Sequence, residues 1–181
     1  GTGLHSNGQP LYMTLSGTSQ ATAVASGVGA LVREYLREQQ SIFTPSGSLI
    51  KAVLINGATD LGTPDIPNAY EGWGQINLEQ SVMPTSGSTN LGQFYDDKRL
   101  IRPGFSLSYP FILDMDKGVE LTLAWSDEAG SANAEQSQSR LVNDLDMILE
   151  GPNGEIYLGN VFSNGDRKST RLNSSHQIIS Y

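Results

Sequence analysis

Apolar and small side chains recur every three or four residues from Ser19 to about Gln39, which predicts a helix. The members of this stripe are Ala21, Val24, Ala25, Val28, Leu31, Val32, Tyr35 and Leu36. Charged side chains gather only at its end, from Arg33 to Glu38. We therefore expect the first three turns to be buried and the last turns to emerge into solvent. The alanines and glycines of the first half imply that another backbone approaches closely there.

A second helix is predicted through Leu49–Leu54, with Ser46 or Ser48 as its cap and an end near Gly57. Helical spacing then stops, and residues 84–89, Pro-Thr-Ser-Gly-Ser-Thr, are the best linker candidate in the chain. The sequence therefore predicts a helical unit before the linker and a different unit after it.

Beyond the linker the apolar positions alternate, as expected for half-buried strands. Three runs show this pattern: Phe105, Leu107, Tyr109 and Phe111; Val119, Leu121 and Leu123; Leu145, Met147 and Leu149. The turn at 151–154 leads into Ile156 and Leu158 as the return strand of a hairpin. Residues 85–165 are therefore predicted to form an all-β domain, interrupted by a hydrophilic loop at 128–139.

Composition narrows the functional classes. The 181 residues include 11 Lys and Arg against 19 Asp and Glu, a net charge of −8 that disfavours nucleic-acid and anionic-membrane partners. The chain has no cysteine, which excludes disulfides, thiolate zinc sites and cysteine nucleophiles. The most apolar stretch, 21–36, is broken by Ser26, Arg33 and Glu34, so no membrane span is expected. The first residues include neither an initiator Met nor a signal segment, so we expect the interior of a longer protein.

Candidate chemistry lies where an extended stretch meets the first helix, at residues 15–22. Unpaired backbone N–H groups at a helix N-terminus stabilise an oxyanion, and Gly17 lets a substrate backbone approach Ser19. By spacing alone, however, Gly-Thr-Ser before a helix is more often a simple N-cap than a nucleophile. Both interpretations stay open on the residues alone.

Residues 17–23, Gly-Thr-Ser-Gln-Ala-Thr-Ala, resemble the nucleophile motif of subtilisin-like proteases. The resemblance continues through 49–58 and the closing Gly-Trp-Gly-Gln-Ile-Asn at 72–77. It implies that Ser19 is the catalytic nucleophile and that Gly17 and Thr18 contribute to substrate binding. Ala23 stands where the family has Pro, and alanine preserves the helix.

The resemblance also implies that the catalytic Asp and His and an oxyanion Asn precede the serine in the family's chain order. His5 lacks the family's context for that base, so the chain alone is expected to be inactive while a longer parent hydrolyses peptide bonds. The alternative is a catalytically inactive relative that acts as a calcium-stabilised binding or adhesion module.

The second half resembles the C-terminal β-barrel or jelly-roll domain of alkaline and kexin-like subtilases, through 125–127, 141–146 and 151–160. That resemblance implies calcium. Its candidate ligands are Asp127, Asn143, Asp144 and Asp146, whose oxygens would need backbone carbonyls and water to complete a calcium shell. The competing interpretation is that Asp144 and Asp146 alternate with Leu145 and Met147 and simply face solvent.

The basic, polar tail 166–181 resembles translated sequencing-adapter read-through, or is a genuine C-terminal tail. The predicted fold class is thus α/β: the C-terminal part of a subtilisin-like parallel-sheet domain (1–83), an incomplete all-β domain (85–165) and a tail that does not belong to the fold (166–181). The family resemblance further implies a secreted monomer that acts on protein or peptide substrates.

Overall fold

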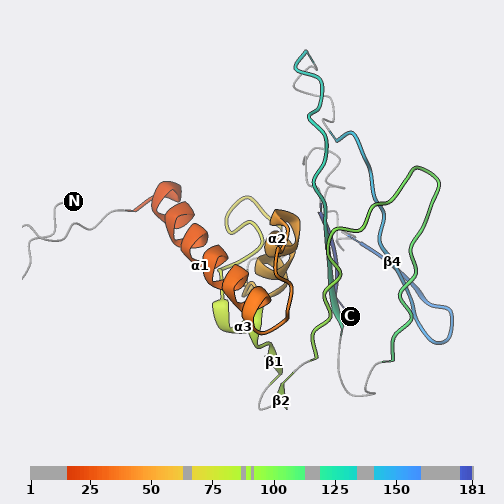
Figure 1. Ribbon diagram of the computed structural model, residues 1–181, viewed down its shortest axis with the longest axis horizontal. Helices are drawn as coiled ribbons and strands as arrows, with labels where there is room; N and C mark the ends of the chain where they lie inside the picture. The colour runs from red at the N-terminus through yellow and green to blue at the C-terminus, as the bar shows by residue number, and fades with distance from the viewer. Residues whose placement is uncertain are drawn as a thin grey trace, which may run out of the picture.

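The computed structural model describes residues 16–62, 67–86, 89–90, 92–112, 119–133 and 141–159, together with the backbone of 176–180. Its helices are α1 (Thr18–Glu38), α2 (Gly47–Asn56) and α3 (Leu78–Val82). Its strands are β1 (Thr85–Ser86), β2 (Thr89–Asn90), β3 (Glu120–Ala124), β4 (Ile148–Glu150), β5 (Ile156–Leu158) and β6 (His176–Ser180). The helices gather on one side of the molecule and β3–β6 on the other (Figure 1).

Both predicted helices are confirmed within a few residues of their expected bounds. Helix α2 begins after Ser46, whose side-chain Oγ accepts the backbone N–H of Leu49 at 3.0 Å. This bond satisfies one of the N–H groups that a helix start leaves unpaired, so Ser46 is the cap and Ser48 is not.

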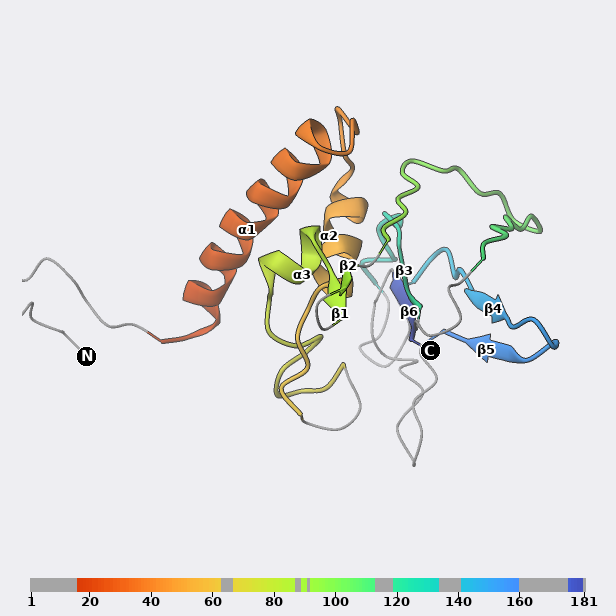
Figure 2. The same ribbon diagram turned by 90° about the horizontal axis from the view of Figure 1, so that it is seen from below.

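The expected direction of burial along α1 is wrong. Val32 and Leu36, near the end of the helix, are fully buried, whereas residues 16–24 are exposed and Val24 keeps 60% of its surface. The reason is that α2 and α3 pack against the second half only, and the first turns project away from the other helices (Figure 2). Among the described residues, no backbone approaches Gly27 closely.

One small core holds the three helices together. It consists of Val32 and Leu36 from α1, Leu49 and Val53 from α2, and Val82 from α3. Full burial of each such side chain contributes roughly 1.5–3 kcal/mol to the free energy of folding, so these five side chains dominate the packing of the three helices.

The described part of the chain contains no helix long and apolar enough to cross a bilayer.

Helices α2 and α3 meet at Gly57, the C-cap of α2. A β-carbon at this position would lie 2.4 Å from the backbone N and Cα of Ser81, which is itself 2% exposed. Only glycine allows this approach, so the junction of α2 and α3 depends on one missing methyl group.

The strands of the second half form pairs and no larger sheet within the described ranges. Strand β3 pairs with β6, and β4 pairs with β5 across the predicted turn; both pairs are antiparallel. The predicted hairpin is confirmed, with Leu149 opposite Tyr157. Neither a parallel sheet nor a barrel appears among the described residues. The described part of the chain therefore combines helices with small two-stranded antiparallel sheets.

One other expectation for this half is wrong. Residues 105–111 contain no strand, and Phe105, Leu107, Tyr109 and Phe111 keep 71, 50, 46 and 47% of their surfaces. Alternation gives a strand only when a neighbouring strand supplies hydrogen bonds and cover, and no described strand pairs with this segment. The linker also has structure, because β1 and β2 pair across it.

We predict that Gly57→Ala destabilises the chain, because the added methyl group collides with the backbone of Ser81. The free energy of unfolding should fall by about 1–3 kcal/mol, measured by denaturant titration. Gly47→Ala is the matched control: a β-carbon there meets no atom within 4 Å, and alanine favours helix, so stability should not fall. Equal effects of the two substitutions would contradict the role given to Gly57.

Candidate active site

Ser19 lies in the first turn of α1 and is exposed. The helix begins at Thr18, and the N-cap is Gly17, with φ 146° and ψ 166° and no side-chain capping bond. The possibility that Ser19 is itself the N-cap is therefore wrong. Because Gly17 has no side chain, the N-terminal N–H groups of α1 receive no side-chain oxygen from the cap position.

Hydroxyl groups further along α1 are used differently. Thr22 Oγ1 donates to the carbonyl of Thr18 at 2.7 Å, and Ser26 Oγ donates to the carbonyl of Thr22 at 2.9 Å. Within the described ranges, no residue forms such a bond with the hydroxyl of Ser19. Ser19 is thus exposed in the first turn of a helix, where backbone N–H groups have no partner within the helix, and this position suits nucleophilic attack on a carbonyl.

A serine needs a base to accept its proton, and the described side chains do not supply one. Helix α1 has no acidic residue in its first turn. His5 and the side chain of His176 lie outside the described residues. The described part of the chain therefore holds the candidate nucleophile and its helix end, without a group that would activate it.

The segment 72–77 has a structural role. Thr59 and Gln75 exchange two backbone hydrogen bonds of 2.8 Å, which join the end of α2 to this segment. Asn77 caps α3, since its Oδ1 accepts the N–H of Gln80 at 3.1 Å, and its Nδ2 donates to Thr59 Oγ1 at 3.1 Å. This cap was not predicted, although Asn followed by Leu-Glu-Gln is a recognisable helix start.

In the second half, Asp127 and Asn143 lie together. The Oδ1 atom of Asp127 accepts the backbone N–H of Asn143 at 3.0 Å and its side-chain Nδ2 at 2.7 Å, and Oδ2 accepts the backbone N–H of Val142 at 2.8 Å. Trp125 Nε1 donates to the carbonyl of Asn143 at 3.1 Å. The hydrogen bond from Val142 is the largest reason that the pKa of Asp127 lies below its ordinary value.

The other two calcium candidates stand apart from this cluster. Asp144 and Asp146 are exposed, and Leu145 and Met147 between and beside them are half-buried, which is the alternation of a half-buried extended segment. The described residues contain no group of three His, Cys, Asp or Glu side chains close enough to hold a metal ion. The carboxylate of Asp127 accepts the N–H groups of Val142 and Asn143, and calcium at these four positions stays a prediction from the sequence.

Known proteins match both halves of the chain. The family model described as "Subtilase family" matches residues 1–74. The "Serine protease/ABC transporter B family protein tagA" of Dictyostelium discoideum is 35% identical over 164 residues, which cover 82% of this chain and 9% of the relative. This match must extend beyond residue 74 because of the share of the chain that it covers.

Two further relatives carry similar names. The serine protease AprX of Bacillus subtilis is 41% identical over 71 residues, 39% of this chain and 14% of the relative. The "Serine protease/ABC transporter B family protein tagD" of Dictyostelium discoideum is 23% identical over 192 residues, which cover 78% of this chain and 10% of the relative. The chain thus spans about a tenth of the length of these relatives.

The motif at Ser19 and these matches agree: residues 1–74 match the subtilase family. The relatives bear the name serine protease, which confirms the recognition made from residues 17–23 and 72–77. The matches do not single out a kexin-like subgroup, which stays a prediction.

We predict that Asp127→Asn opens the contact between Asp127 and residues 142–143, because an amide group presents only one acceptor oxygen and turns its own donors toward N–H groups. Amide exchange at Val142 and Asn143 should become severalfold faster. Asp146→Asn is the matched control, since Asp146 is exposed and stands outside this cluster.

The same contact should depend on pH in the unmodified chain. The hydrogen bonds to Asp127 should persist above the lowered pKa of its carboxyl group and be lost as pH falls through that pKa, as followed by NMR.

Proposed function

We propose that the protein carrying this chain is a subtilisin-like serine endopeptidase with Ser19 as its nucleophile. The observation that carries the proposal is the geometry at the start of α1: Gly17 occupies the cap position without a side chain, and the exposed Ser19 follows in the first turn. A serine whose only purpose was to cap the helix would stand one residue before the first turn and accept an N–H bond.

In the proposed reaction, Ser19 Oγ attacks the carbonyl carbon of a peptide bond, and its proton passes to a base. The backbone N–H of Ser19, at the positive end of α1, contributes to stabilising the oxyanion of the tetrahedral intermediate. The base returns the proton to the leaving amine, which departs and leaves an acyl-enzyme. Water then hydrolyses the ester and regenerates the serine. The Asp and His that the family resemblance implies belong to the protein beyond the described residues.

Several finer statements extend this proposal. The substrates are proteins or peptides, and Gly17 and Thr18 lie beside the scissile bond. The protein is secreted and acts as a monomer, and the second half belongs to a β-domain of the jelly-roll or barrel type. The family resemblance supports these statements, and the β4–β5 hairpin, present at its predicted position, supports the last.

Active-site labelling tests the nucleophile. We expect the full-length protein to react with a fluorophosphonate probe, and Ser19→Ala to abolish the labelling while leaving the fold intact. Ser26→Ala is the matched control, because Ser26 lies on the same helix and its hydroxyl bonds to the carbonyl of Thr22. Labelling that persists in Ser19→Ala would contradict the assignment. A full-length protein that is folded yet unlabelled would favour the inactive relative.

Calcium is tested separately. If the second half binds calcium, chelation should lower the melting temperature of the full-length protein, and added calcium should restore it. An unchanged melting temperature would contradict the calcium prediction without affecting the assignment of Ser19.

A further inference from the structure

A short segment after the β1–β2 pair, residues 93–98, crosses the helical unit although it lies beyond the predicted linker. Its first residue, Gln93, contacts two helices: Nε2 donates to the carbonyl of Ser81 in α3 at 3.2 Å, and Oε1 accepts the hydroxyl of Tyr35 in α1 at 3.3 Å. One side chain therefore joins α1 to α3.

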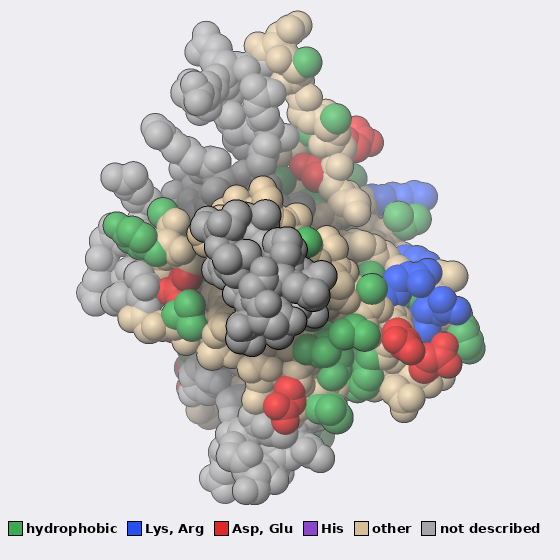
Figure 3. Space-filling view, turned by 90° about the vertical axis from the view of Figure 1, so that its left-hand side faces the viewer, with side chains coloured by type: hydrophobic (Ala, Val, Ile, Leu, Met, Phe, Trp, Pro, Cys, Tyr) green, Lys and Arg blue, Asp and Glu red, His purple; other side chains and the backbone are tan. Residues whose placement is uncertain are grey.

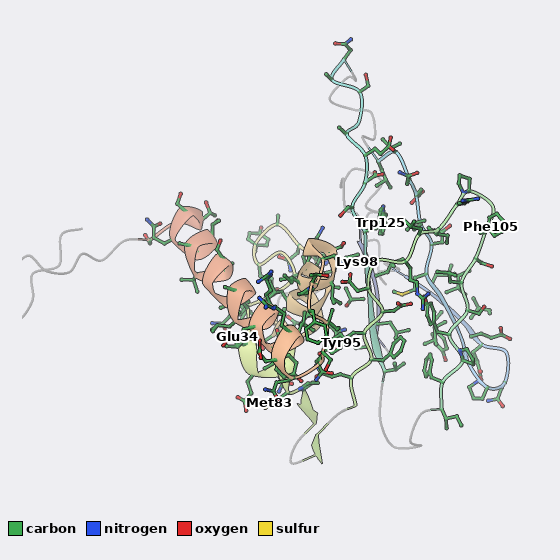
Figure 4. All side chains as sticks on the ribbon, viewed as in Figure 1. Glu34, Met83, Tyr95, Lys98, Phe105 and Trp125 are labelled. Carbon is green, nitrogen blue, oxygen red and sulfur yellow. The ribbon has the colours of Figure 1, made fainter. Side chains whose placement is uncertain are left out.

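The middle of the segment reaches the core. Tyr95 is half-buried and packs against the cluster of Val32, Leu36, Leu49, Val53 and Val82. Burial, followed by the neighbouring Tyr35, raises the pKa of Tyr95 to about 12. The labelled Tyr95 and Lys98 lie beside the helices, whereas Phe105, further along the chain, lies far from them (Figure 4). The segment thus departs from the helical unit after Lys98.

The end of the segment binds the N-cap of α2 and the connection before it. Both oxygens of the Asp97 carboxylate bind Ser46, one accepting the side-chain hydroxyl and the other the backbone N–H at 3.0 Å. Because Ser46 Oγ in turn accepts the N–H of Leu49, Asp97 orients the cap of α2. Lys98 Nζ donates to Thr44 Oγ1 at 2.6 Å, in the connection between α1 and α2.

These contacts join residues separated by 12 to 58 positions in the chain, and they reach α1, α3 and the N-cap of α2. All of the segment lies outside residues 1–74, the part that matches the subtilase family. We propose that residues 93–98 form a strap that fixes α1, α2 and α3 to one another, with Asp97 as its main attachment to α2. The unit that carries Ser19 therefore extends to Lys98.

The strap explains how a core of five buried side chains holds three helices. Hydrophobic contacts are not directional, so they bring the helices together without fixing their orientation. The hydrogen bonds of Gln93 and Asp97 supply that direction at α1, α2 and α3. Tyr95 adds apolar cover over the same core, which ties the strap to the helices as one unit.

Amide hydrogen exchange in the full chain tests the strap. For Asp97→Ala, we expect exchange at Leu49 and Ile50 in the first turn of α2 to become about fivefold faster or more, as loss of a helix cap does. Because a strap acts on several helices at once, amides in the last turn of α1, from Tyr35 to Glu38, should also exchange faster. Asp97→Glu, which keeps a carboxylate, should recover part of the protection.

The matched control is Asp96→Ala. Asp96 is the adjacent carboxylate, but its partners are Arg99 at 2.8 Å and the hydroxyl of Tyr109 at 2.6 Å, both outside the helices. Exchange in α1 and α2 should be unchanged in this variant. Equal effects of the two substitutions, an effect of Asp97→Ala confined to α2, or no effect would each overturn the strap. These measurements do not depend on the reactivity of Ser19, so the strap and the proposed function are tested independently.

Discussion

The packing of the second half of α1 against α2 and α3 is the interaction on which the rest of the helical unit depends. Val32 and Leu36 have no exposed surface, and Leu49, Val53 and Val82 close over them. The close contact at Gly57, the cap at Ser46 and the bonds of residues 93–98 all surround this one cluster. If the cluster opened, these polar contacts would lose their geometry, because their partners lie on the helices that the cluster holds together.

The same packing explains why the start of α1 is open. The apolar and small side chains of its first turns stay on the surface, and hydrophobic side chains remain visible on the face from which α1 projects (Figure 3). A stripe of alanine, valine and glycine with no cover among the described residues agrees with the small share of the relatives that this chain spans. The site therefore has a well-packed base and an exposed tip.

Local signals in the sequence were sufficient for the helices, for narrowing the cap of α2 to Ser46 or Ser48, and for the β4–β5 hairpin, because periodicity, capping and turn residues act over a few positions. The motif at Ser19 was also sufficient to recognise the family. The burial of α1 and the absence of a strand at 105–111 depend on which distant segments pack against them. The same residue pattern is compatible with several such packing arrangements. Asp97 was not predicted because its partner lies 51 residues away, with no local pattern to connect them.

Helix α1 behaves mechanically as a lever. At a rise of 1.5 Å per residue, Ser19 lies about 20 Å along the axis from the anchored Val32. A tilt of about three degrees at the anchored end displaces the serine by about 1 Å, an error that slows a well-oriented reaction about 100-fold. Among the described residues, the contacts that hold α1 in place lie toward the opposite end of the helix from Ser19. Mutations there, far from any substrate, would change the rate of the proposed reaction without touching its chemistry.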